Sequence, residues 1–131
     1  MKLLLDTHIW IWSLLKPGKL ARRVLRALEN PANELWLSPI SIWELTILVE
    51  EGRVVLNAEL EAWLAHAMRA APLKEAPLTW EVALAAGNTG LPHRDPADAF
   101  LVATAKVFEL TLVTADARLQ AAKGIPLLPS W

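Results

Sequence analysis

Apolar and polar positions divide the chain into short, mostly apolar runs and longer runs with helical spacing. The short runs predict strands at residues 2–6, 35–38, 73–76, 110–114 and 125–128. The longer runs predict helices at residues 7–15, 19–29, 39–51, 58–71, 79–86, 95–109 and 117–123. Residues 53–56 fit neither pattern. Because strands alternate with helices, residues 1–131 are expected to form one doubly wound α/β domain, with a central parallel sheet covered by helices.

The stretch from His93 to Asp116 is the most informative part of this pattern. Residues 95–98 (DPAD) begin a helix that continues to Phe108 with hardly any polar residue. Residues 110–114 then form an apolar strand, and Asp116 follows it almost at once. Carboxylates therefore stand at the edges of two buried elements, which is where an open α/β sheet places its functional site.

Composition narrows the class of protein without identifying it. The chain is 54% hydrophobic with a mean hydropathy of +0.31, yet no apolar run approaches the ~18 residues that a membrane span needs. The absence of cysteine excludes disulfides and thiolate metal sites. Asp6 interrupts the first apolar run, which argues against a signal peptide and favours a cytoplasmic protein. The net charge of −1 means that binding to nucleic acid would need a local basic patch.

Acidic residues are distributed unevenly along the predicted elements. The chain has 14 acidic residues, and the few that fall where a strand gives way to a helix are Asp6, Glu44, Asp95, Asp98 and Asp116. In a parallel sheet these positions converge on one edge. A pocket of carboxylates is a hard oxygen site that suits Mg²⁺ or Mn²⁺.

Helix capping is the alternative explanation of each acid taken alone. Asp95 before Pro96 fits an N-cap, Asp98 fits a first-turn acid, and Ser41 with Glu44 fits a capping box. Capping explains the set less well, because serine, threonine or asparagine can also cap a helix. Two acids in one helical turn also repel each other unless a cation neutralises them.

The acids lie in motifs that resemble a known family. The segments LLLDTH, SPISIWEL, HRDPADAFLVATA and LVTADARL resemble the four acidic motifs of PIN domains, in the same order. The resemblance extends from Leu3 to about Pro129 and is greatest to the VapC-type toxins of bacterial and archaeal toxin–antitoxin pairs. It implies a metal-dependent ribonuclease on a doubly wound sheet, often dimeric and held inactive by an antitoxin protein.

The resemblance also implies roles for individual residues. The metal-binding and catalytic acids would be Asp6, Glu44, Asp98 and Asp116. Auxiliary roles would fall to Asp95, Thr7 and Thr114. The chain departs from many related sequences in having Ala97 and Ala99 beside the third acid, where an aromatic residue and an arginine are common.

The chemistry of phosphodiester cleavage agrees with these residue types. A carboxylate-bound Mg²⁺ or Mn²⁺ activates water and stabilises the extra negative charge, so no Ser-His-Asp or Cys-His set is required. The three histidines lack metal-ligand spacing and are assigned structural or surface roles. Arg94 and Arg118 flank the acids and are the candidates for RNA binding. A basic stripe at Lys19, Arg22, Arg23 and Arg26 could also hold RNA phosphates, but a solvated helix face is the favoured interpretation.

Tryptophan usage suggests a protein partner. The chain has seven Trp and no Tyr. Trp10 and Trp12 point about 200° apart on one helix, so we expect one of them to cover a partner unless that helix is buried on both sides. The expected partners are RNA, an antitoxin and a second copy of the chain.

The positions of the aspartates argue against two other classes of α/β protein that bind Mg²⁺. Phosphoacceptor receivers need an aspartate near the middle of the chain, but none lies between Asp6 and Asp95. Phosphatases of the haloacid type need an aspartate where His8 stands. A catalytically silent PIN-like scaffold that binds a protein or RNA partner is the remaining alternative, and an intact set of acids argues against it.

Overall fold

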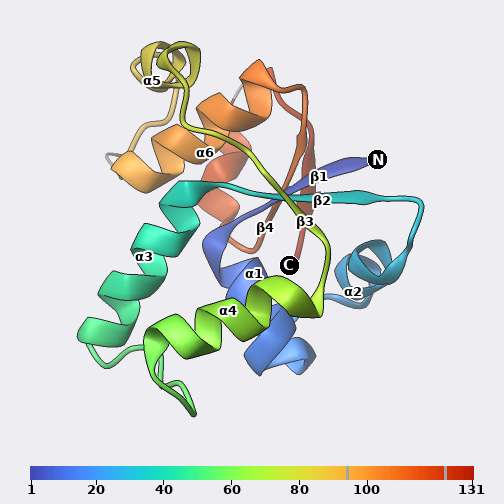
Figure 1. The fold of residues 1–131 in the computed structure, drawn as a ribbon. Helices are drawn as coiled ribbons and strands as arrows, with labels where there is room; N and C mark the ends of the chain where they lie inside the picture. Colours follow the sequence, from blue (N-terminus) through green and yellow to red (C-terminus); the bar gives the residue numbers. More distant parts are fainter. Residues whose placement is uncertain (94, 123) are drawn as a thin grey trace.

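The computed structural model describes residues 1–93, 95–122 and 124–131, and its centre is a five-stranded parallel sheet (Figure 1). The strands are β1 (Lys2–Leu5), β2 (Glu34–Leu37), β3 (Leu73–Glu75), β4 (Thr111–Thr114) and β5 (Leu127–Pro129). Their order across the sheet is β3-β2-β1-β4-β5, and every neighbouring pair is parallel. The predicted α/β class with a central parallel sheet is confirmed.

Strand β1 lies at the middle of the sheet and is buried on both faces. Leu4 pairs with Trp36 of β2 on one side and with Leu112 of β4 on the other. Side chains alternate along a strand, so Leu3 and Leu5 enter one apolar core whereas Leu4 enters the other. The continuous leucine run of this strand is thus explained by two buried faces.

Helices cover both faces of the sheet, as Figure 1 shows. The helices are α1 (Thr7–Leu15), α2 (Arg22–Glu29), α3 (Pro39–Glu50), α4 (Leu60–Ala70), α5 (Trp80–Ala86) and α6 (Pro96–Val107). One core joins β1 to α1, α2, α3 and α4, and the other joins it to α6 and the short 3-10 helix η2 (Ala117–Ala121). Within the described residues, no helix is long and apolar enough to cross a membrane.

Polar side chains cap the helices that begin at the carboxyl edge of the sheet. Asp6 accepts a hydrogen bond from the backbone at the start of α1, and Asp116 does so for η2. Ser38 caps α3 through the N–H of Ile40, and Asp95 caps α6. Side chains that satisfy the first N–H groups of a helix set the angle at which it leaves the sheet. These caps place the helix N-termini together at the carboxyl edge.

The second helix starts later than predicted. Residues Pro17–Lys19 form a 3-10 helix (η1), and α2 begins at Arg22 instead of residue 19. Leu20 is extended and buried, which interrupts the helical run. Arg23 donates to the carbonyls of Pro129 and Trp131, at 2.9 Å each, and so holds the C-terminal residues. The predicted four-residue basic stripe is therefore wrong.

The other differences from the predicted boundaries are of one or two residues, and two of them lie near the C-terminus. The predicted helix at residues 117–123 is a 3-10 helix that ends at Ala121, and Lys123 lies outside the described residues. The last strand begins at Leu127, two residues later than predicted. Its register is set by pairing with β4, where Val113 lies opposite Leu128. Pairing across a sheet is a tertiary property, so the local sequence pattern placed this strand less accurately.

Candidate active site

All five acids singled out in the sequence line one cavity at the carboxyl edge of the sheet. The cavity has a volume of about 360 Å³, and its acidic residues are Asp6, Glu44, Asp95, Asp98 and Asp116. They come from the end of β1, from α3, from the start of α6 and from the turn after β4. Residues up to 110 positions apart in sequence therefore meet in one place. This cavity is called the acidic cavity below.

Asp6 is the most deeply buried of these acids. Its side chain follows β1, at the centre of the sheet, and the residue is only 8% exposed. One carboxylate oxygen accepts from the backbone N–H of Thr7 at 2.7 Å, and the other accepts from the hydroxyl of Thr114 at 2.6 Å. Burial, with a contribution from the nearby charges of Asp98 and Glu44, raises the pKa of Asp6 to about 7. Burial therefore disfavours a negative charge at this position.

A hydroxyl pair orients Glu44 from the neighbouring helix. The Thr7 hydroxyl donates to the carboxylate of Glu44 and lies 2.8 Å from the hydroxyl of Ser41. Burial raises the pKa of Glu44 above its ordinary value. Ser41 is fully buried and does not cap α3, because Ser38 does so; the capping-box explanation of Ser41 and Glu44 is wrong. Thr7 and Ser41 instead join α1 to α3 beside the cavity.

Asp98 receives its hydrogen bond from a histidine. The Nε2 atom of His93 lies 2.8 Å from a carboxylate oxygen of Asp98, whose side chain is 10% exposed. Burial is the largest cause that raises the pKa of Asp98. The other ring nitrogen of His93 is buried and has no hydrogen-bond partner among the described residues. Sequence reasoning missed this contact, although His93 stands only five positions before Asp98.

Asp116 is held by an arginine of the following turn. Arg118 contacts both carboxylate oxygens of Asp116, at 2.7 Å through Nη2 and at 3.0–3.1 Å through Nε. These hydrogen bonds lower the pKa of Asp116. The same Nη2 atom lies 3.8 Å from Asp98, so Arg118 spans two of the acids. Arg118 is exposed and thus remains accessible from solvent, as its predicted contact with RNA requires.

Asp95 has a capping role as well as a place in the cavity. One of its carboxylate oxygens accepts from the N–H groups of Ala97 and Asp98, at 3.0 and 3.4 Å. The capping interpretation is correct for this residue. Asp98 belongs to the first turn of the same helix but directs its carboxylate to His93. Arg94, the second candidate for RNA binding, lies outside the described residues.

The chain is also similar to known proteins. A model of the PIN domain family matches residues 3–125 of the chain. The chain belongs to the PIN domain family. It is 34% identical over 120 residues to Ribonuclease VapC22 of Mycobacterium tuberculosis, which covers 89% of this chain and 88% of that protein.

Several solved structures share the fold of this PIN domain. A chain of VapBC2 from Rickettsia felis, bound to a promoter DNA fragment, has a TM-score of 0.73 at 18% identity, with 98% of each chain covered. DNA-bound VapBC from Salmonella typhimurium gives 0.72 at 16% identity, covering 100% of this chain and 99% of that one. FitAcB from Neisseria gonorrhoeae gives 0.64 at 25% identity, with 98% of each covered.

The electrostatics of the acidic cavity disfavour the charged forms of most of its acids. Three of its four predicted metal-binding acids have a raised pKa, because burial and mutual repulsion disfavour their charged forms. Each acid is turned toward a donor of the protein itself. As they stand, no three acidic or histidine side chains of the described residues are arranged to hold a metal ion. The oxygen-rich donor set nevertheless suits a hard divalent cation, whose charge would relieve the repulsion.

Proposed function

We propose that the protein is a divalent-metal-dependent endoribonuclease and the toxin of a toxin–antitoxin pair. The observation that carries the proposal is the acidic cavity, in which four side chains carried by different elements meet within a PIN domain. The 34% identity to a ribonuclease over nearly the whole chain supports the same activity. Single-stranded or loop RNA, in the cytoplasm, is the proposed substrate, because its bases and backbone are accessible to protein side chains.

Asp6, Glu44, Asp98 and Asp116 would hold the metal ion, which we propose to be Mg²⁺ or Mn²⁺. When bound, the ion supplies activation of water and stabilisation of charge on the scissile phosphate. Two hydroxyls hold the ligands in place: Thr114 fixes one oxygen of Asp6 and Thr7 fixes Glu44. Such contacts to ligands commonly change metal affinity or activity by about 10- to 100-fold.

Arg118 has two roles in this proposal, one toward the acids and one toward RNA. In the structure its guanidinium balances the charge of Asp116 and lies near Asp98. A divalent ion would take over that balance, which frees the guanidinium to bind a phosphate oxygen of RNA. Arg94, by its place next to Asp95 in the sequence, is proposed to bind RNA as well.

A cognate antitoxin is the proposed protein partner. Two of the similar solved structures described above are of VapBC proteins, and VapBC is a family of toxin–antitoxin systems, which supports this partner. An apolar groove of about 580 Å³ between α3 and α4 offers a surface for it, with Trp43 53% and Met68 43% exposed. Burial of such side chains would contribute to binding at roughly 25 cal/mol per Å² of apolar surface.

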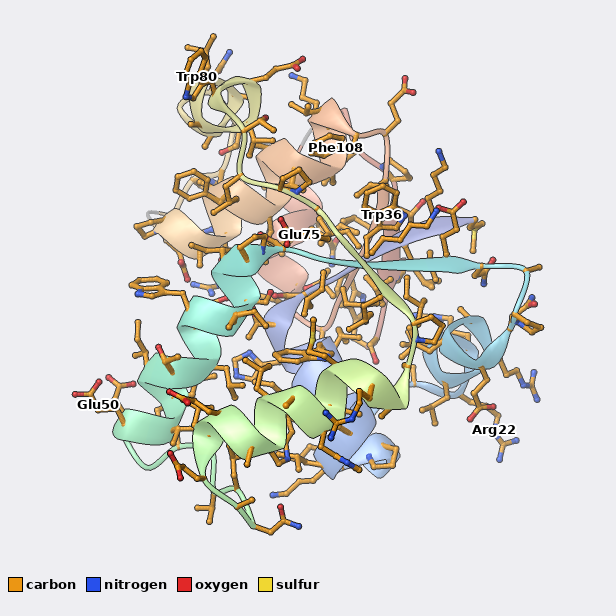
Figure 2. All side chains as sticks on the ribbon, in the orientation of Figure 1. Arg22, Trp36, Glu50, Glu75, Trp80 and Phe108 are labelled. Carbon is orange, nitrogen blue, oxygen red and sulfur yellow. The ribbon has the colours of Figure 1, made fainter. Side chains whose placement is uncertain are left out.

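A homodimer is proposed through α5. Trp80 and Leu84 of this helix are 96% and 82% exposed, and Figure 2 shows Trp80 projecting away from the body of the molecule. Light scattering should give a dimer for the wild type and a larger monomer fraction for Trp80→Ser. A clean wild-type monomer at high concentration would contradict this surface.

The ribonuclease proposal is tested with purified protein and a labelled single-stranded RNA. We expect cleavage with Mg²⁺ or Mn²⁺, none in EDTA, and none for Glu44→Gln. Glu50→Gln, at an exposed position of the same helix, is the matched control and should cleave as the wild type does. Undiminished cleavage in EDTA would contradict the proposed dependence on a divalent metal ion. Binding of RNA without cleavage under every condition would favour the silent scaffold.

A further inference from the structure

A second cavity adjoins the acidic cavity and differs from it in chemistry. Its volume is about 440 Å³, and it lies between the end of α1 and the loop after α3. The two cavities share His8, Trp12, Leu48 and Arg53 in their linings, so they are continuous. We call the second one the Trp12 pocket. A chain of nucleotides that enters one cavity can therefore extend into the other.

An aromatic side chain forms one wall of the Trp12 pocket. Trp10 points into the core, where it is 2% exposed and packs edge-on against Trp63 at 6.0 Å. Trp12, two positions later on α1, is half-buried and faces the cavities. The ring of His8 lies 5.4 Å from the Trp12 ring, at 55°. The sequence argument that one of these two tryptophans faces outward thus selects Trp12.

Three cations surround this aromatic wall. Lys16, Lys19 and Arg53 line the pocket and are all exposed. The Nζ atom of Lys19 lies 5.2 Å from the centre of the Trp12 ring, in a cation–π contact. Arg53 has an ion pair with Glu51 at 3.6 Å, both exposed, which contributes little and leaves the guanidinium available. The lining of the pocket contains no acidic residue among the described residues.

We propose that the Trp12 pocket binds a nucleotide of single-stranded RNA next to the scissile phosphate. The base stacks on Trp12, and an adjoining phosphate binds Arg53 and Lys19. Stacking on aromatic rings between basic side chains is how proteins hold single-stranded nucleic acid. The continuity with the acidic cavity supplies the position along the strand. The inference rests on the proposed ribonuclease function, since it names a subsite of that activity.

A segment of a protein partner is the competing occupant. A partner that covers this pocket would need acidic side chains to match three cations, together with an apolar residue for Trp12. RNA meets both requirements at every nucleotide, because each carries a phosphate and a base with two flat faces. The geometry therefore favours RNA, and the experiment below has a different result for each occupant.

The direct test observes Trp12 by NMR in EDTA, where cleavage is blocked. The indole N–H resonance of Trp12 is identified as the one that disappears in Trp12→Phe. Addition of adenosine 5′-monophosphate, and then of a 12-residue oligouridylate, should shift this resonance while those of Trp43 and Trp80 stay in place. A Trp12 resonance that shifts with neither probe would overturn the proposal and favour a protein segment as the occupant of the pocket.

Binding of the fluorescently labelled oligouridylate measures the contribution of each wall. We expect Trp12→Leu to weaken binding by roughly 5- to 100-fold, as loss of one stacked base does, and Trp12→Phe by much less. Lys19→Gln with Arg53→Gln should flatten the dependence of log K on log salt by about 0.7, because the contacts to one phosphate are lost. Arg22→Gln, exposed on α2, is the matched control and should leave both quantities unchanged.

The outcomes separate this inference from the ribonuclease proposal. If the wild type cleaves RNA and Trp12→Leu binds the oligouridylate as tightly as the wild type does, the nucleotide pocket is overturned and the ribonuclease proposal stands. Nucleotide-dependent shifts of Trp12 in a protein that never cleaves RNA would overturn the ribonuclease and keep the pocket as a nucleotide site. Folding of each variant is checked by its thermal melt, and the acidic cavity by the Mg²⁺-dependent shift of that melt.

Discussion

The acidic cavity and the Trp12 pocket share a boundary but are built from different parts of the fold. Residues at the ends of β1 and β4 and in the helices beside them form the acidic cavity, where Asp6 and Asp98 are 8% and 7% exposed. Exposed lysines and an arginine, at the end of α1 and in a loop, form the charged part of the pocket. The acids, whose distances from one another must be fixed, are thus carried by the sheet and the helices packed on it. The cations, which we expect to contact a flexible RNA strand, belong to exposed side chains that can adapt.

Asp98→Asn is expected to have the largest effect on the acidic side of this comparison. It removes a proposed metal ligand, so RNA cleavage should fall by more than about 100-fold. Wild type should gain about 2.7 kcal/mol in Mg²⁺ at 100 times its dissociation constant, and the variant should lose most of that gain. Thermal melts in EDTA and Mg²⁺ measure it. Glu50→Gln, at an exposed position of α3, is the control. A full Mg²⁺ shift in Asp98→Asn would show that the site has been misplaced.

The pH dependence of stability tests how strongly burial acts on Asp6. Folding raises its pKa from 3.8 to about 7, so the folded protein keeps a proton that the unfolded chain releases above about pH 4. The associated stability is complete below pH 4 and is lost as pH rises to about 7, on the order of a few kcal/mol. Melts in EDTA should therefore fall between pH 4.5 and 7.5, and Asp6→Asn should flatten the curve. A wild-type curve that rises over this range would contradict the raised pKa.

Thr7→Val tests whether a ligand's orientation matters as well as its charge. The change removes the hydroxyl that donates to Glu44 but retains nearly the same volume. We expect metal affinity, measured by calorimetry, to fall by about 10-fold. The melt in EDTA should also fall, because the buried hydroxyl of Ser41 loses its partner. Thr46→Val removes a hydroxyl of α3 that donates to the carbonyl of Trp43, and is the control. Equal effects of the two changes would assign Thr7 a purely structural role.

Arg118→Ala should have the smallest and most informative effect, because it changes the two regions in opposite senses. Without the guanidinium, Asp116 is free for a metal ion, so metal should bind a few-fold more tightly. RNA should bind a few-fold more weakly, and more weakly than to Arg22→Ala, which lies far from the acids in sequence. Calorimetry and RNA titration measure the two effects. A metal affinity that falls with RNA affinity would show that Arg118 supports the site instead of competing for it.

Much of the fold follows from local pattern, because the period of apolar residues differs between strands and helices. The five strands and the six α-helices lie close to their predicted positions. The errors fall at η1, at η2 and at the start of β5, where a proline, a tight turn or strand pairing overrides helical or strand spacing. At these places the local sequence carries little information on the outcome.

The sequence by itself determined the class of fold, the order of its motifs and the five acids, because short-range spacing and residue chemistry are sufficient for these. The tertiary structure alone decided what each acid contacts: Thr114 with Asp6, His93 with Asp98 and Arg118 with two acids. It also decided that Trp12 faces a cationic pocket while Trp10 is buried. Burial and the proximity of distant charges depend on how the elements pack, and no spacing along the chain encodes them.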